Sequence, residues 1–83
     1  MIKKYAADIA AQMGMQLSRV SVVEGRDIGC LDVHLLKLMS DGQLVSALVY
    51  QSELDHLQSG SSCERLELKI RSALSRLQLL LAP

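Results

Sequence analysis

The dipeptide Asp41-Gly42 lies between two apolar runs, and this arrangement limits the possible folds more than any other feature of the sequence. Aspartate followed by glycine favours the two-residue turn that joins antiparallel strands, because both residues tolerate a positive φ. The run at residues 30–39 and the run at residues 43–50 are therefore predicted to be paired strands. The rest of the chain has to be built around this hairpin.

Both predicted strands of the hairpin are apolar on both sides. In residues 43–50 the two sets of alternating apolar residues are Leu44, Leu48 and Tyr50, and Val45, Ala47 and Val49. In the first strand, Leu36 and Leu38 alternate with Leu35 and Met39. An antiparallel sheet with one face in water alternates apolar with polar residues, and these strands do not. We therefore expect both faces of the sheet to be covered.

The residues before the hairpin predict one helix and one further strand. Ile2, Ile9 and Met13, with Tyr5 or Ala6 between them, recur at three- and four-residue intervals, which is typical of an amphipathic helix. Gly14 follows at the position of a helix-ending glycine. The run at residues 17–23 is rich in β-formers and leads into a loop at residues 24–29 that contains two glycines.

Two helices are predicted after the hairpin. Ser52 and Asp55 form an imperfect capping box for a short helix that Gly60 ends. Ser61 and Glu64 form a second capping box, from which a long helix runs to about residue 81. The main apolar stripe of the long helix is Leu66, Ile70, Ala73, Leu74, Leu77 and Leu81. A sparser second strip holds Leu68 and Leu79.

These elements predict a single α+β domain over residues 1–83, in the order α-β-β-β-α-α. Its three-stranded antiparallel sheet packs against the long C-terminal helix. Three helices, two of them short, most easily cover one face of this sheet, so we expect a partner on the other. A homodimer is the simplest arrangement, and a different protein is the alternative. The expected interface residues are Leu36, Leu38, Val45, Val49, Leu68 and Leu79.

The composition argues against nucleic acid as the partner. Nine basic and nine acidic residues give a formal net charge of zero, whereas a phosphate-binding surface has a basic excess. The chain has no Phe or Trp and only two Tyr, so it offers little on which bases could stack. The long helix still carries four basic residues, Arg65, Lys69, Arg71 and Arg76.

The chain is expected to be a cytoplasmic protein that does not cross a membrane. No apolar run approaches the ~20 residues that a bilayer crossing requires. Asp8 and Gln12 interrupt the apolar run that would follow the basic start of a signal peptide. Cys30 and Cys63 could form at most one disulfide, which is too few for a secreted scaffold of this size.

No combination of side chains predicts catalysis. Cys30, Asp32 and His34 alternate along a predicted strand and share a face, but with His56 and Cys63 they give no recognised zinc spacing. The acidic residues lie mainly in turns and at helix starts, where they have structural roles. We therefore expect no enzyme activity, cofactor or metal, and we expect both cysteines to pack as small apolar residues.

Three functions stay open at this point. The first is a small non-enzymatic adaptor or regulator that acts as a homodimer or through an apolar partner-binding surface. The second is a protein that holds an apolar ligand in an aliphatic cavity, with Arg26, His34 or Tyr50 contacting the ligand's polar end. The third is a weak nucleic-acid-associated regulator that uses the basic face of the long helix. In its general character the sequence is similar to short bacterial and phage proteins, but no motif assigns it to a family.

Overall fold

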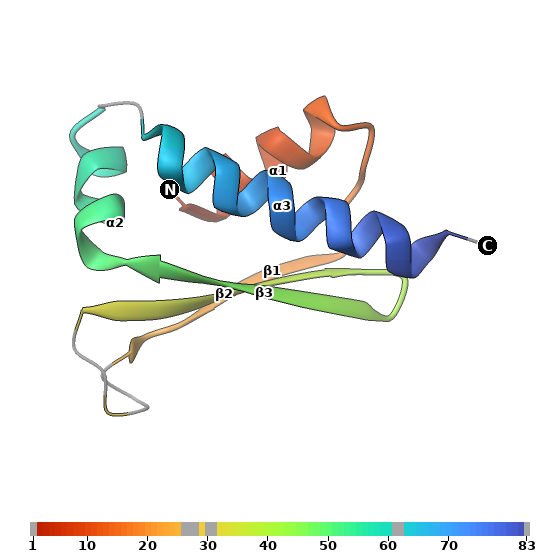
Figure 1. Cartoon of the computed structure of the whole chain (residues 1–83), viewed down its shortest axis with the longest axis horizontal. Coiled ribbons are helices and arrows are strands. Elements are labelled where there is room, and N and C mark those ends of the chain that lie inside the picture. Colours follow the sequence, from red (N-terminus) through yellow and green to blue (C-terminus); the bar gives the residue numbers. More distant parts are fainter. Residues whose placement is uncertain (1, 26–28, 30–31, 61–62, 83) are drawn as a thin grey trace.

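The computed structural model describes residues 2–25, 29, 32–60 and 63–82. The elements are α1 (Ile2–Gln12), β1 (Arg19–Val23), β2 (Val33–Ser40), β3 (Gln43–Tyr50), α2 (Gln51–Gln58) and α3 (Glu64–Leu81). Their order confirms the predicted α-β-β-β-α-α sequence. Figure 1 shows two layers: α1 and α3 lie on one side of the sheet, and none of the described elements covers the other side.

The sheet is an antiparallel meander with the strand order β1-β2-β3. Ser40 pairs with Gln43 across the turn, and Asp41 and Gly42 have φ values of 48° and 79°. Two successive positive φ values define the turn whose twist matches that of paired strands, so the Asp-Gly prediction is confirmed. Because β1 pairs with the other side of β2, β3 lies at the edge of the sheet, beside β2 only.

Gly14 ends α1 as the sequence predicts, with a φ of 73°. The amide of Met15 donates to the carbonyl of Ala10 at 2.8 Å, and the amide of Gly14 donates to the carbonyl of Ala11 at 3.0 Å. This pair of bonds is the Schellman motif, which satisfies the last carbonyls of a helix and needs a left-handed residue. The chain then turns back to enter β1.

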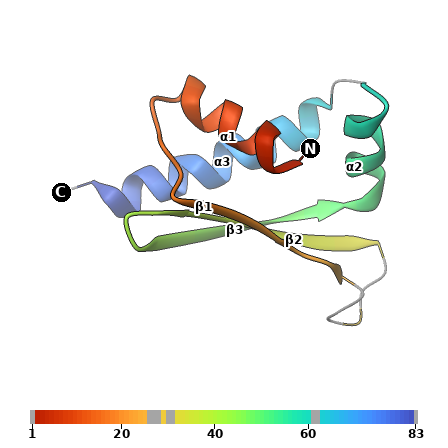
Figure 2. The same cartoon turned by 180° about the vertical axis from the view of Figure 1, so that it is seen from behind.

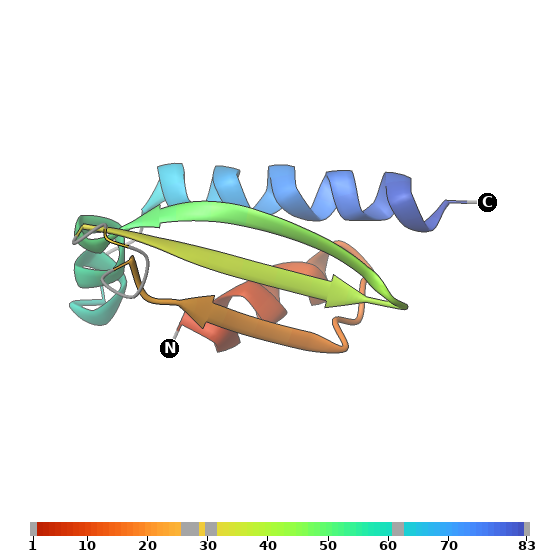
Figure 3. The ribbon, with the colours of Figure 1, turned by 90° about the horizontal axis from the view of Figure 1, so that it is seen from below.

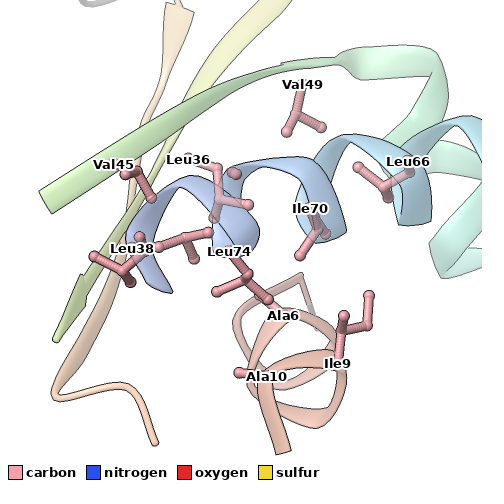
Figure 4. Close-up of a cluster of buried hydrophobic side chains, with 12 residues drawn as sticks. Ala6, Ile9, Ala10, Leu36, Leu38, Val45, Val49, Leu66, Ile70 and Leu74 are labelled. Carbon is pink, nitrogen blue, oxygen red and sulfur yellow. The ribbon is translucent and has the colours of Figure 1, made fainter. Parts of the chain in front are cut away.

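The core lies between the helix layer and one face of the sheet (Figure 4). It combines apolar residues of α1, β2, β3 and α3: Ala6, Ile9, Ala10, Leu36, Leu38, Val45, Val49, Leu66, Ile70, Ala73, Leu74 and Leu77. Seen from behind in Figure 2, α1 and α3 lie beside each other on the sheet. The side chain of Arg71 joins them by donating to Gln12 Oε1 at 2.6 Å. The predicted main stripe of the long helix is therefore its buried face.

The structure corrects the expectation that Leu36, Leu38, Val45 and Val49 contact a partner. These four residues are at most 8% exposed, because the chain's own α1 and α3 cover them. Successive residues of a strand point to opposite faces, so an interface on the same strands would use the alternate residues. The other two predicted interface residues, Leu68 and Leu79, are 63% and 77% exposed.

Several element boundaries differ from the sequence prediction. β1 begins at Arg19, and β2 begins at Val33. α2 begins one residue before Ser52, because Glu53 Oε1 accepts the amide of Tyr50 at 2.8 Å and so caps the helix from inside. α3 begins after Cys63, and the predicted cap at Ser61 lies outside the described residues.

Candidate functional site

The sheet face opposite the helices, which we call the open face, is not covered by any of the described elements (Figure 3). Its residues alternate with the core residues of each strand. They are Arg19, Ser21 and Val23 of β1, Val33, Leu35, Lys37 and Met39 of β2, and Leu44, Ser46, Leu48 and Tyr50 of β3. The prediction that both faces of the hairpin are apolar holds for this face too.

Apolar side chains run across neighbouring strands of the open face. Leu35 lies opposite Leu48, and Met39 lies opposite Leu44, so each half of the β2–β3 hairpin carries an apolar pair. Leu44, Leu48 and Tyr50 are 46%, 55% and 45% exposed. Directly opposed side chains in an antiparallel pair are in contact distance, so each of the two pairs forms a small apolar surface.

The charge on the open face has one sign. Lys37 lies at the centre of β2, between Ser21 and Ser46, and Arg19 lies at the start of β1. No acidic residue stands among the open-face residues. The chain's overall neutrality therefore hides a locally positive apolar surface.

A second surface feature, which we call the edge groove, lies between β3 and α3. It has a volume of about 780 Å³, and its lining includes Leu48 and Tyr50 of β3 and Leu68, Ser72 and Arg76 of α3. Arg76 Nη2 donates to the carbonyl oxygen of Ser46 at 3.1 Å. This contact shows that the peptide groups of the β3 edge face the groove.

Next to Tyr50 and Lys69, which line the edge groove, a buried carboxylate joins three elements. Glu53 of α2 is 4% exposed. Its Oε1 accepts both the amide of Tyr50 and Lys69 Nζ, each at 2.8 Å. Lys69 Nζ also lies 4.2 Å from the centre of the Tyr50 ring, a cation–π distance. The sequence pattern did not reveal this cluster, because Glu53 and Lys69 belong to different helices.

His34, a predicted ligand contact, is used within the fold. The amide of Gly25 donates to its Nδ1 at 3.1 Å, so Nε2 carries the hydrogen and donates to Gln51 Oε1 at 2.6 Å. His34 lies on the inner face of β2, whereas Tyr50 lies on the open face, so the structure does not bring these two together. Arg26, the third predicted contact, lies outside the described residues.

The four basic residues of α3 do not form one free surface. Lys69 is paired with Glu53, Arg71 contacts Glu67 at 3.5 Å as well as Gln12, and Arg76 holds the carbonyl of Ser46. Arg65, Lys69 and Arg76 all line the edge groove. The basic face expected from the sequence is thus divided between internal contacts and the edge groove.

The remaining predictions from the sequence concern a metal site, the two cysteines and a membrane-spanning helix. Within residues 2–25, 29, 32–60 and 63–82, no group of three or more His, Cys, Asp or Glu residues is placed to hold a metal ion. Cys63 is a free, half-buried thiol packed against the core, and Cys30 lies outside the described residues. None of the helices in the described part of the chain has the length and apolar character of a membrane span.

Comparison with known proteins adds no relative. No family model matches the chain, and neither a curated protein nor a solved structure shows significant similarity to it. The fold defines a small α+β domain whose sheet is covered on one face. The open face and the edge groove are two surfaces of this domain that the described elements leave accessible to a partner.

Proposed function

We propose that this chain is a small, non-enzymatic interaction protein of the cytoplasm, an adaptor or regulator that binds another protein through its open face. One observation carries the proposal: a sheet with apolar residues on both sides has helices on one side only (Figure 1). Covering apolar surface contributes roughly 25 cal/mol per Å². A partner that covers Leu44, Leu48 and Tyr50 would gain this free energy.

The charge of the open face favours a different protein over a second copy of this chain. Stacking two open faces would place the Lys37 and Arg19 side chains of both copies in one interface without a carboxylate from either open face. Like charges that lose water at an interface oppose binding. A partner with apolar side chains and at least one carboxylate near Lys37 would remove this repulsion. We therefore propose a partner of that chemistry.

The intact mass of the assembly from native cells tests this proposal. The tagged full chain is recovered under native conditions, and the complex is weighed without denaturation. The test variant is Leu44→Lys, which changes an exposed leucine of the open face that does not line the edge groove, and the matched control is Leu79→Lys, which changes an exposed leucine of α3 outside that face. Circular dichroism confirms that both variants are folded.

We expect the wild type and Leu79→Lys to hold the same additional protein, and we expect Leu44→Lys to lose it. A folded wild-type monomer without a bound protein would overturn the proposal. A mass of twice the single chain that Leu44→Lys reduces to the mass of one chain would also overturn it, because the occupant of the open face would then be a second copy. A bound protein that Leu44→Lys retains would show that the open face is not its docking surface.

A further inference from the structure

We propose that the edge groove binds an extended, mainly apolar and acidic segment of another protein, which adds to the sheet as a fourth strand beside β3. This surface differs from the open face, although Ser46, Leu48 and Tyr50 contribute to both. The proposal does not depend on the partner proposed for the open face. Four observations on β3 and α3 carry it.

The first observation is that β3 is an edge strand whose own sequence does not hinder the pairing of another strand. Its sequence from Gln43 to Tyr50 contains no charged residue and no proline, and it pairs with β2 over its whole length. Proteins usually protect edge strands with charges, prolines, bulges or short length, since an open edge accepts another strand. The opposite edge strand, β1, is five residues long and begins with Arg19.

The second observation is the direction of the free peptide groups. Gln43 pairs with Ser40 across a two-residue turn, so Gln43, Val45, Ala47 and Val49 direct their peptide groups towards β2. The residues between them direct theirs outward. The bond from Arg76 to the Ser46 carbonyl agrees with this assignment.

The third observation is the position of α3. Seen from the open face, α3 runs along the outer edge of β3 and beyond it, instead of over the middle of the sheet (Figure 3). An added strand would lie beside β3 and against Leu68 and Ser72 of α3, which line the groove. It would therefore gain side-chain contacts as well as backbone hydrogen bonds.

The same position of α3 argues against a second copy as the added strand. Antiparallel pairing of two β3 strands about a two-fold axis puts both α3 helices on the same side of the joined sheet. Paired strands lie about 4.8 Å apart, whereas helix axes approach only to about 8 Å. Two helices that each follow the β3 edge would overlap. The fourth strand has to come from a segment without such a helix above it.

The fourth observation is the charge of the edge groove. Its lining contains Arg65, Lys69 and Arg76 but only one acidic residue, Glu64, and Lys69 is already paired with Glu53. An incoming strand would replace Arg76 at the Ser46 carbonyl. The guanidinium group would then be free to bind a carboxylate with two parallel hydrogen bonds. The expected segment is therefore apolar and acidic.

Selection from a random peptide library displayed on phage tests the proposal and needs no assumption about the sequence of the partner. The library is selected on the wild type, and one enriched peptide is synthesised for binding measurements. We expect enriched peptides to combine β-branched or aromatic residues with Asp or Glu. N-methylation of the peptide amides that face β3 should abolish binding, because it removes the strand hydrogen bonds.

The variants Ser72→Glu and Ser75→Glu form a matched pair. Both serines are exposed on α3, but only Ser72 lines the edge groove. Ser72→Glu should weaken peptide binding by at least about ten-fold through like-charge repulsion, and Ser75→Glu should leave it unchanged. Lys37→Glu, which alters the open face outside the groove, should also leave it unchanged.

Three results would overturn the proposal: no enriched peptide, binding that survives N-methylation, or equal losses in Ser72→Glu and Ser75→Glu. A peptide whose binding depends on Lys37 and not on Ser72 would belong to the open face, which separates the two proposals. Nuclear magnetic resonance of the bound state should show slower hydrogen exchange at the amides of Leu44, Ser46 and Leu48.

Discussion

At the residue scale, Glu53 holds the junction between the sheet and two helices. Its Oε1 accepts one backbone amide and one ammonium group, and its Oε2 is buried without a hydrogen-bond partner among the described residues. A buried carboxylate loses hydration on folding and depends on its partners for compensation. The bond to Lys69 therefore matters more to folding than an ion pair in water would.

We expect Glu53→Gln to lower the free energy of unfolding by about 1–3 kcal/mol, because it removes a charged hydrogen bond from a buried site. Glu67→Gln is the control, since Glu67 and Arg71 form an ion pair with side chains 45% and 35% exposed. Such surface pairs contribute less than about 1 kcal/mol. Urea unfolding of both variants checks the prediction, and equal losses would contradict it.

Tyr5 is expected to make the stability of the fold depend on pH in the alkaline range. Burial raises the pKa of Tyr5 above 10.0, and the nearby carboxylate of Glu67 raises that pKa further. Because the pKa is higher in the folded state, folding favours the neutral phenol. This contribution to stability is complete below the pKa of the unfolded chain, and it is lost as the pH rises through the higher folded pKa.

The variant Tyr50→Phe makes the Tyr5 titration measurable, because Tyr5 is then the only tyrosine. Absorbance of the tyrosinate ion should show a midpoint above 10.0 in the folded protein and a lower midpoint in urea. Circular dichroism over the same pH range identifies where the chain is still folded. Identical midpoints in the two states would contradict the prediction.

At the scale of the elements, the two faces of β2 and β3 have similar composition but different surroundings. Leu36 is 1% exposed beneath the helices, whereas Leu48 on β3 is 55% exposed. Removing a buried leucine leaves a cavity that the surrounding atoms fill only in part, while removing an exposed one does not. The stability cost of truncation therefore reports which face the helices cover.

We expect Leu36→Ala to destabilise the isolated chain by about 2–5 kcal/mol. Leu48→Ala should cost less than about 1 kcal/mol, since most of its side chain is already in water. Urea unfolding at low protein concentration, where no partner covers the open face, makes the comparison. A larger loss for Leu48→Ala would mean that this face is buried in solution.

The elements themselves could be predicted well from local patterns. Asp41-Gly42 defined a strand at residues 43–50 that matches β3, Gly14 marked the end of α1, and the apolar stripe from Leu66 to Leu77 is the buried face of α3. The sequence could not predict which face of the sheet the helices cover. Both alternating sets are apolar, so periodicity contains no information on which set the helices cover.

At the scale of the whole molecule, the prediction that the helices cover only one face agrees with the arrangement in Figure 1. The candidate site was predicted only in part. The exposure of Leu68 could be anticipated from its place outside the main stripe of α3. The edge groove could not, because it depends on where α3 lies relative to β3, and the Glu53–Lys69 pair depends on the packing of α2 against α3.

The order of the elements along the chain has a consequence for synthesis on the ribosome. The three strands pair in the order in which they are translated, and α3 follows them. The hairpin can therefore close while α3 is still unmade, at a stage when β3 lacks its cover on the core side as well. A nascent or prematurely terminated chain of this kind would expose apolar residues on both sides of β3, and exposed apolar strands favour aggregation.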